Sequence, residues 1–433
     1  MESLSISGRA VFPDGVRPAE IHVDPLSGSI VSVKELQRVE DDGKIVFPGF
    51  IDIHVHAREY PRPALSNSQS TSLWDAACRK ETFLTAGQAA INGGVTLFAA
   101  MPNDPAPPDN ACTYKQKQLI AASSPCPVIP FAAITGTSEP WEDLPYKVYL
   151  DAGPSAVNFT TWADLENALA RYKGCRIFFH AEDPETLRKF QGDGPRWRNR
   201  PPGAEILAVE KILEITAKFG LHSHICHVST EKAVSLICDY NSGAQVRVTC
   251  EVTPHHLFFS ISNGDILAAE SNVILASEFL DCNPPLRPES DRRFLLDALQ
   301  NGVVDVLASD HAPHTIQDKR GGSPGMPHLD TLGPFCGWLI EQCGFGLERV
   351  AEILSAAPAM LFRHDLELPH GIIAAGCAAS LSLLDTGSQT LVEGNQIKGR
   401  GPLRTRCGWS PFEGIALPAR VVGTLVRGKY YVF

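Results

Sequence analysis

The sequence is short of positive charge and has no long hydrophobic run, and both deficits exclude whole classes of protein. Its 38 lysine and arginine residues against 49 aspartate and glutamate residues give a formal net charge of −11. Such an acidic surface disfavours nucleic acid as a ligand. No apolar run approaches the roughly 18–20 residues of a membrane span. The first residues also lack the basic start and apolar stretch of a secretory signal, so we expect a cytoplasmic protein without a membrane partner.

Disulfide cross-links are also not expected. The chain has 12 cysteines, and without an export signal these indicate reduced thiols rather than a disulfide framework. Its 433 residues are 44% hydrophobic and 20% charged, which is enough apolar material for a sizeable core and excludes a disordered protein. The length suits one large barrel with an appendage.

Short β-rich runs alternate with helix-compatible segments through most of the chain. The runs span 45–56, 95–101, 127–134, 146–150, 176–180, 222–228, 246–252 and 304–310. The helix-compatible segments are 74–92, 110–123, 161–173, 204–219, 230–240 and 290–301, with another at 329–343. Eight strands interleaved with helices predict an α/β fold, a (β/α)₈ TIM-type barrel. A doubly wound open sheet is the alternative.

Both ends of the chain consist of short strands and turns. We therefore predict a small discontinuous β domain from residues 1–46 and 370–433, with the barrel domain, residues 47–369, inserted between them. Four segments rich in Gly, Pro, Ser or polar residues are expected at the carboxyl ends of the barrel strands. They are Tyr60–Leu73, Asp151–Thr160, Phe190–Gly203 and Thr315–Pro327.

Candidate metal ligands lie at or near the ends of five of these runs. Alternation along the first strand would put two imidazoles, two residues apart, on the same side. Imidazole and carboxylate groups suit a borderline metal such as zinc. Taken singly, each group also has a structural explanation, as a hydrogen-bonded histidine, a helix cap or an ordinary ion pair. The groups are His54, His56, His180, His227, Glu251 and Asp310.

Lys147 stands in the otherwise apolar run YKVYL. A lysine at the start of a strand commonly extends its amine to solvent. Burial would instead lower the pKa of the amine and make it nucleophilic. The residues alone leave both interpretations open.

Several motifs together resemble the dihydroorotases of the amidohydrolase superfamily. They are PGFIDIHVHAREY, AAMPN, FFHAED, HICHVS, CEVTPHHLFF, CNPPLR and ASDHAPH. The chain is most similar to the dihydroorotase domain of the animal multifunctional pyrimidine-synthesis protein. The likeness covers about residues 45–345 and recurs at GWSPFEG near the C-terminus. The His-x-His pair is typical of the whole superfamily, whereas HVHxRE, MPN and DHAPH together are specific to dihydroorotase-like members.

The resemblance implies a zinc-dependent reaction of de novo pyrimidine biosynthesis. N-carbamoyl-L-aspartate loses water reversibly to form L-dihydroorotate, at two zinc ions bridged by a hydroxide and by carboxylated Lys147. By the same likeness His54, His56 and Asp310 hold one zinc, and His180 and His227 hold the other. Asp310 is the implied general acid and base.

The resemblance also implies contacts to this small-molecule substrate and a third metal. Arg58 and Asn103 match positions that bind the substrate carboxylate, and His314 and Arg287 match further substrate contacts. Cys226 and Glu251, with His54, match the ligands of a third zinc, although Cys226 could equally be a small buried apolar residue. A homodimer is expected.

The chain departs from the dihydroorotase pattern in three places. The HVHARE motif lacks the Pro-Gly that often follows it, Pro-Tyr precedes Lys147, and the segment 151–160 is longer than the active-site loop it would replace. Three alternatives therefore stay open. One is a related cyclic amidohydrolase such as a dihydropyrimidinase, hydantoinase or allantoinase. The second is an inactive dihydroorotase-like scaffold, and the third is a structural zinc protein.

Overall fold

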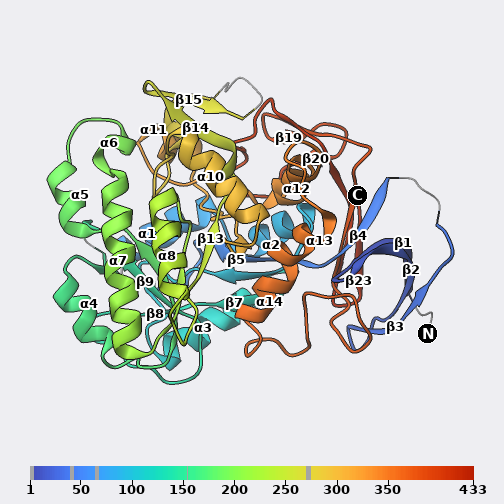
Figure 1. Ribbon diagram of the computed structural model, residues 1–433, viewed down its shortest axis with the longest axis horizontal. Coiled ribbons are helices and arrows are strands. Elements are labelled where there is room, and N and C mark those ends of the chain that lie inside the picture. The colour runs from blue at the N-terminus through green and yellow to red at the C-terminus, as the bar shows by residue number, and fades with distance from the viewer. Residues whose placement is uncertain (1–3, 40–42, 64–67, 154, 270–274) are drawn as a thin grey trace.

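The computed structural model describes residues 4–39, 43–63, 68–153, 155–269 and 275–433. Two bodies lie side by side in Figure 1: a large α/β body, and a β-rich body that contains the sheet strands of both chain ends. Within the described part of the chain, no helix is both long and apolar enough to cross a bilayer.

The large body is the predicted (β/α)₈ barrel, and each of the eight expected runs contains a barrel strand. The strands are β5 (Phe50–Val55), β6 (Val95–Ala100), β7 (Val128–Pro130) continued by β8 (Ala132–Ala133), β9 (Tyr146–Leu150), β11 (Arg176–Ala181), β12 (His222–Ile225), β13 (Thr249–Val252) and β16 (Val306–Leu307). Neighbouring strands pair in parallel. The ring closes beyond β16, where the amide of His311 donates to the carbonyl of His54 (3.1 Å) and the amide of His56 donates to the carbonyl of His311 (2.8 Å).

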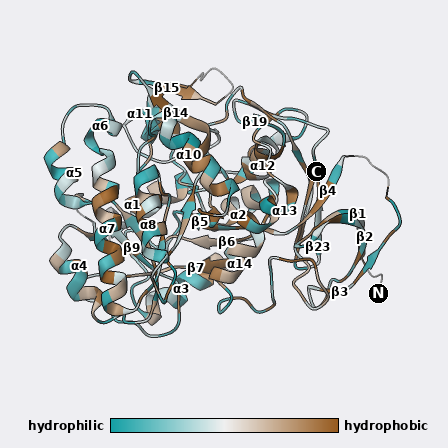
Figure 2. Ribbon diagram, in the orientation of Figure 1, coloured by the Kyte–Doolittle hydropathy of each residue, from teal (hydrophilic) through white to brown (hydrophobic). Residues whose placement is uncertain are grey.

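Helices cover the outside of the barrel. The longer ones are α1 (Ser68–Lys80), α2 (Phe83–Asn92), α3 (Ala111–Ala121), α4 (Trp162–Leu169), α7 (Pro202–Phe219), α8 (Glu231–Asn241), α10 (Glu289–Gln300) and α12 (Leu332–Glu341). Shorter helices are α5 (Pro184–Phe190), α6 (Arg196–Asn199), α9 (Pro254–Phe258), α11 (Ile316–Arg320), α13 (Leu347–Ala351) and α14 (Ala357–Leu361). In Figure 2, α7 carries hydrophobic and hydrophilic residues on different sides, as expected of a helix packed on a sheet.

The expected helix segment 74–92 is interrupted at residues 81–82. Thr82 has an extended backbone, and its hydroxyl accepts a hydrogen bond from the amide of Thr85, which starts α2 with a capping box. Glu81 lies between the two helices and is fully buried. The break between the two helices places the carboxylate of Glu81 inside the protein.

The β-rich body is built around a seven-stranded sheet with the order β23-β22-β17-β4-β1-β2-β3. The N-terminal strands are β1 (Leu4–Phe12), β2 (Gly15–Asp24), β3 (Ser29–Glu35) and β4 (Lys44–Pro48), and the C-terminal ones are β17 (Leu381–Asp385), β22 (Arg420–Val426) and β23 (Lys429–Val432). Strand β4 joins the two ends of the chain, because it pairs with both β1 and β17.

Smaller sheets complete the fold. Strands β18 (Thr390–Glu393), β19 (Gln396–Ile397), β20 (Gly401–Pro402) and β21 (Ala416–Leu417) form one, and the hairpin β14 (Phe259–Ser262) and β15 (Asp265–Ala268) forms another. Strand β10 (Asn158–Phe159) extends the barrel sheet beside β9.

The expected run 45–56 is two strands in the structure, and Gly49 separates them. A Cβ atom at Gly49 would lie 2.3 Å from Thr96 Oγ1 and 2.9 Å from the carbonyl carbon of Ser380, so only glycine fits. The chain passes from the flanking sheet (β4) into the first barrel strand (β5) at this point.

The interior of the barrel is apolar at one end. Ile51 and Ile53 of β5 pack there with Leu97, Phe131 and Phe178 from other strands. Regular alternation would then turn His54 outward. The pairing of β5 with β6 instead shifts register between Asp52 and Val55. This irregularity reorients the strand so that both His54 and His56 line the cavity at the carboxyl end of the barrel.

Candidate metal centre and substrate cavity

A cavity of about 320 Å³ opens at the carboxyl ends of the barrel strands. Most of the residues singled out in the sequence line it: His54, His56, Arg58, Asn103, His180, His227, Asp310 and His314. Three of the four predicted loop segments also contribute to its wall or contact it, through Asp151, Ser155, Val157, Asn158, Pro324 and Gly325, and through Arg196, which donates to Asn283 Oδ1 (3.0 Å). Part of the fourth segment, residues 64–67, lies outside the described residues.

His54, His56 and Asp310 form the first donor group. Asp310 Oδ1 lies 3.3 Å from His54 Nε2 and 3.2 Å from His56 Nε2. One donor atom from each residue lies within 4.8 Å of the others, and all three side chains are buried. Two imidazoles and a carboxylate around one point are a donor set that zinc prefers.

His54 belongs to a second donor group as well, with Cys226 and Glu251. Its Nδ1 forms a short contact with Glu251 Oε1. The other carboxylate oxygen of Glu251 accepts from His224 Nε2 at 3.1 Å. Cys226 also packs in the apolar interior of the barrel, so both interpretations of this residue agree with its surroundings.

Lys147 is fully buried at the centre of these groups. Its Nζ lies 2.8 Å from Cys226 Sγ and 5.0 Å from the centre of the Tyr149 ring. Of the two interpretations that the sequence left open, the structure agrees with burial, because β9 is covered on both sides.

His180 and His227 form the remaining histidine pair. His180 Nδ1 faces His227 Nε2 at 3.0 Å, and the ring of His227 lies 5.2 Å from that of His54. The Nδ1 atom of His227 is buried with no hydrogen-bond partner among the described residues. Glu182 accepts from His180 Nε2 (3.0 Å), the kind of carboxylate contact that orients a metal-binding histidine.

The carboxylates of Glu251 and Asp310 favour a positive charge at His54, the residue between them. Burial alone would lower the pKa of His54, but the carboxylates of Glu251 and Asp310 outweigh it and raise that pKa to about 10. Burial would raise the pKa of Asp310, but His54 and His56 hold it at about 2. Burial lowers the pKa of His56 to about 4. A divalent cation would meet the same demand for positive charge, so these donors fit a metal centre.

Arg58, Asn103 and His314 lie beside the metal-ligand candidates. The guanidinium of Arg58 contacts His314 Nε2 at 3.2 Å, and Asn103 Oδ1 contacts His56 Nδ1 at 2.7 Å. Burial and the neighbouring charges of Arg58 and Lys80 hold the pKa of His314 far below its usual value, so this imidazole is neutral. The group therefore offers one fixed positive charge and several donors next to Asp310.

Arg287 is the predicted substrate contact that does not line the cavity. Its Nε donates to Ser229 Oγ (3.0 Å) and one terminal nitrogen donates to the carbonyl of Arg200 (2.8 Å). The other terminal nitrogen has no hydrogen-bond partner among the described residues and lies 4.0 Å from Glu205. The segment containing Arg287 instead contributes Asn283 to the cavity wall.

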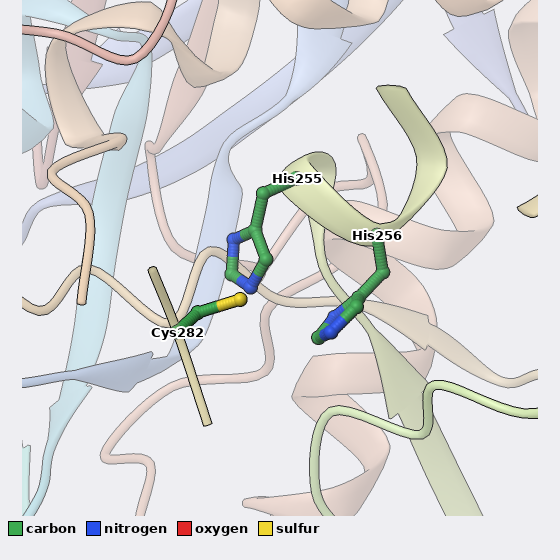
Figure 3. Close-up of side chains that lie close together, drawn as sticks. All are labelled: His255, His256 and Cys282. Atoms are coloured by element: carbon green, nitrogen blue, oxygen red, sulfur yellow. The ribbon is translucent and has the colours of Figure 1, made fainter. Parts of the chain in front are cut away.

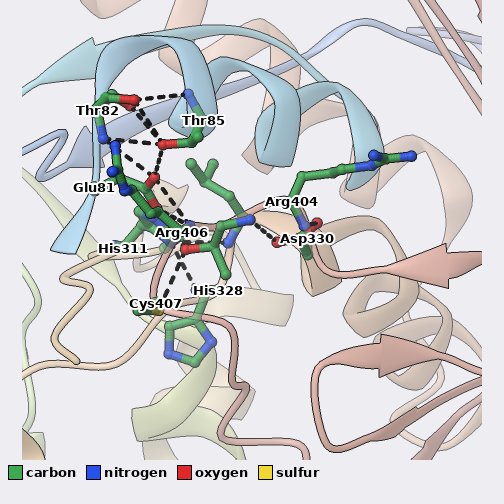
Figure 4. A network of polar contacts seen from close by, with 12 residues as sticks. Glu81, Thr82, Thr85, His311, His328, Asp330, Arg404, Arg406 and Cys407 are labelled. Atoms are coloured by element: carbon green, nitrogen blue, oxygen red, sulfur yellow. Dashed lines mark hydrogen bonds and ion pairs between the residues drawn. The ribbon is translucent and has the colours of Figure 1, made fainter. Parts of the chain in front are cut away.

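Several supporting residues were not singled out in the sequence. Arg200 joins the carboxylates of Glu182 and Asp151 across the edge of the cavity. Glu81 lies at the centre of the network in Figure 4, where its carboxylate accepts from His311 Nε2 (3.2 Å), from the hydroxyl of Thr405 (2.5 Å) and from the amide of Arg406. Glu182 belongs to the FFHAED motif and could have been found through it, whereas no motif contains Glu81.

Comparison with known proteins identifies the class to which this barrel and its histidines belong. Residues 45–430 match the Amidohydrolase family. The chain belongs to that family and is a hydrolase. The match spans the barrel and continues into the C-terminal strands of the flanking sheet.

The curated relatives are more specific. A dihydroorotase of Pyrococcus abyssi is 31% identical over 392 residues, covering 90% of this chain and 84% of the relative. A dihydroorotase of Shouchella clausii is 30% identical over 412 residues, covering 91% and 90% of the two chains. Among solved structures, the L-hydantoinase of Arthrobacter aurescens superposes with a TM-score of 0.81 at 23% identity, covering 98% of this chain and 96% of that one. At that identity, the likeness concerns the fold.

Proposed function

We propose that this protein is a zinc-dependent dihydroorotase of pyrimidine biosynthesis, which reversibly cyclises N-carbamoyl-L-aspartate to L-dihydroorotate. The observation that carries the proposal is the placement of Arg58, Asn103 and His314 beside Asp310 in one cavity. A planar guanidinium suits a carboxylate, and the ring product of this reaction keeps one carboxylate. Relatives named dihydroorotase that cover most of the chain support the same assignment.

The donor groups support a zinc centre. Two zinc ions would be held by His54, His56 and Asp310 and by His180 and His227, with Lys147 as a bridging carbamate, and a third zinc would bind Cys226, Glu251 and His54. A carbamate would have a physical reason, because the unmodified amine of Lys147 is fully buried against one sulfur atom and one ring face, neither of which is a strong hydrogen-bond partner. When bound, the metal pair supplies a nucleophile from water at neutral pH and polarises the carbonyl.

The protein's own groups orient the substrate and move the proton. Arg58 and Asn103 hold the substrate carboxylate, which fixes the ureido nitrogen relative to the carboxyl carbon that it attacks. In the synthetic direction a C–N bond forms and Asp310 accepts the proton from that nitrogen. The carboxyl C–O bond breaks, and the departing oxygen takes this proton and one more from solvent and leaves as water. In hydrolysis the C–N bond breaks and Asp310 returns the proton to the nitrogen.

We further propose a cytoplasmic homodimer and a division of the chain into residues 47–369 and residues 1–46 with 370–433. Size-exclusion chromatography with light scattering tests the dimer. A mass of one chain at micromolar concentration would contradict it.

The decisive experiment pairs metal analysis with hydrolysis of L-dihydroorotate. We expect zinc and turnover in the wild type, zinc without turnover in Asp310→Asn, and lower zinc content in Lys147→Ala that a short carboxylic acid restores. Lys218→Ala is the control, because Lys218 is an exposed lysine whose amine pairs with Glu166 on the outside of the barrel. Full zinc in unrescued Lys147→Ala would refute the bridging carbamate.

A second candidate function is hydrolysis of rings without a carboxylate, such as hydantoins, dihydropyrimidines or allantoin. The fold shared with the L-hydantoinase favours including it. Turnover of those rings but not of dihydroorotate would replace the proposed substrate. Zinc binding without turnover of any ring would indicate an inactive scaffold.

A further inference from the structure

A separate group of side chains that could hold a metal ion includes the neighbour of Asn283, a residue of the cavity wall. His255 and His256 come from α9, and Cys282 comes from the segment that follows the 3-10 turn Ser277–Leu280. One donor atom from each lies within 4.8 Å of the others. The three side chains converge in Figure 3, where a ring nitrogen of His255 points toward the sulfur of Cys282. All three residues are at most 3% exposed.

The hydrogen bonding around this group is incomplete. His255 Nδ1 pairs with His328 Nε2 at 3.0 Å, but His255 Nε2 and His328 Nδ1 are both buried and have no partner among the described residues. A buried polar atom without a partner costs free energy, and most such atoms in native proteins are satisfied by protein, water or an ion. The unpaired nitrogen of His255, Nε2, lies on the edge of the ring that faces Cys282 and His256.

We propose that His255, His256 and Cys282 bind one zinc ion, at a site distinct from the catalytic centre. A thiolate and two imidazoles are a soft to borderline donor set that selects zinc among the common divalent cations. With zinc at Nε2, His255 would donate its Nδ1 hydrogen to His328 Nε2 (3.0 Å), a contact that fixes the orientation of the ring.

Binding exchanges one existing contact for a metal bond. His256 pairs with Thr253 Oγ1 (2.8 Å) and with the carbonyl of Pro284 (3.1 Å), and the nitrogen that binds zinc gives up one of these. Cys282 loses its thiol proton, as any zinc-bound cysteine does. The released group is then either the Thr253 hydroxyl, which can rotate, or the Pro284 carbonyl.

The proposed zinc has a structural role in the wall of the cavity. Cys282 immediately precedes Asn283, which lines the cavity and accepts from Arg196 (3.0 Å). A metal bond from Cys282 to α9 would fix this segment to the end of β13, which carries Glu251. The site therefore supports the cavity without touching the substrate.

Cobalt substitution tests the site without any activity measurement. Cobalt bound to a thiolate gives a near-ultraviolet charge-transfer band, and within the described part of the chain Cys226 is the other thiol placed among donor atoms. We therefore load Cys226→Ser and Cys226→Ser/Cys282→Ser with Co²⁺ and compare spectra and bound cobalt. The band is expected in the single variant and absent from the double variant, with one equivalent of cobalt fewer. No band in the single variant, or an equal band in both, would overturn the proposal.

Two further variants control for misfolding. His255→Gln keeps the thiol and is expected to lose one equivalent of zinc while its near-ultraviolet circular dichroism stays like the wild type. Cys126→Ser removes an equally buried thiol outside the three donor groups and should keep the full zinc content. Unchanged zinc in His255→Gln refutes the site. Failure of catalysis in the wild type would bear only on the proposed function.

Discussion

Removal of the Glu81 carboxylate is expected to destabilise the protein and to slow catalysis, although Glu81 does not line the cavity. The carboxylate accepts hydrogen bonds from two helix-start residues, Thr82 and Thr85, and from His311, Thr405 and Arg406. It thereby connects α2, the residue after Asp310 and the C-terminal segment (Figure 4).

The size of the expected loss of stability depends on the hydrogen-bond donors that would have no other acceptor. The hydroxyl of Thr85 can turn to the carbonyl of Thr82 at 3.3 Å. His311 cannot exchange its ring proton, because its Nδ1 already accepts from the amides of His328 (3.0 Å) and Leu329 (3.3 Å). Each donor left buried and unpaired costs about 1–3 kcal/mol. Glu81→Ala should therefore lower the free energy of unfolding by about 3–5 kcal/mol, similar to breaking a buried ion pair.

The effect on catalysis passes through the backbone of His311. Its amide and carbonyl pair with residues 54 and 56, and Asp310 directly precedes it. We expect kcat for dihydroorotate to fall at least tenfold in Glu81→Ala, with zinc content retained. Glu81→Gln, which keeps one acceptor, should lie between that variant and the wild type.

Urea unfolding followed by circular dichroism measures the stability, and initial rates measure turnover. Glu139→Gln is the control, because Glu139 is an exposed acid and should change stability by less than about 0.5 kcal/mol. Stability of Glu81→Ala within about 1 kcal/mol of the wild type, together with unchanged kcat, would refute the positioning role of this network.

Three other predictions test separate parts of the reasoning. In the native protein the exposed Cys112 and Cys238 should be alkylated first, and all 12 cysteines should react only after unfolding. Mass spectrometry measures the order of modification. Early modification of Cys250 would contradict its burial. A second prediction concerns Asp183, which caps α5. Burial alone would raise the pKa of this carboxyl group, but hydrogen bonds from Thr186 and Trp162 hold it below its usual value. Because that pKa is lowered on folding, its stabilisation is present above about pH 4 and is lost as the pH falls further. Asp183→Ala should therefore cost about 1–2 kcal/mol at pH 7, and the difference between the two proteins in thermal unfolding should shrink below pH 4. Arg58→Met should lower kcat/KM for dihydroorotate roughly 10–100-fold, equivalent to about 1.5–3 kcal/mol, and an equal loss on rings without a carboxylate would argue against carboxylate recognition.

The barrel was predictable because its strands are short, apolar and regularly spaced. The alternation that predicted two inward imidazoles was correct for the pair but not for the whole strand. Ile51 and Ile53 face the interior too, and the register shift between Asp52 and Val55 reconciles the two sets. A local shift of this kind depends on pairing with β6, which no property of the strand itself reveals.

Contacts between distant segments limited the prediction of the supporting residues. Glu81 stands in a helix-like stretch, and its partners Thr405 and Arg406 are more than 320 positions away. His255 and Cys282 both occur in recognised motifs, yet nothing in their spacing shows that α9 brings them together. Arg287 illustrates the opposite case, since its motif was recognised but its guanidinium binds Ser229 and the carbonyl of Arg200.

Backbone strain gives an independent indication of where the function of this fold is concentrated. Among the described residues, five other than glycine have a positive φ, and three of them, Arg58 (62°), His227 (38°) and Asp310 (45°), line the cavity. Such a conformation costs on the order of 1–3 kcal/mol per residue and persists only where surrounding contacts enforce it. Here backbone hydrogen bonds between neighbouring barrel strands do so, including those from His311 to His54 and from Val228 to Glu251 (2.9 Å). Glycine would relieve the strain at each position but would remove the side chain, so retention of a guanidinium, an imidazole and a carboxylate there is explained by the chemistry of the cavity rather than by folding.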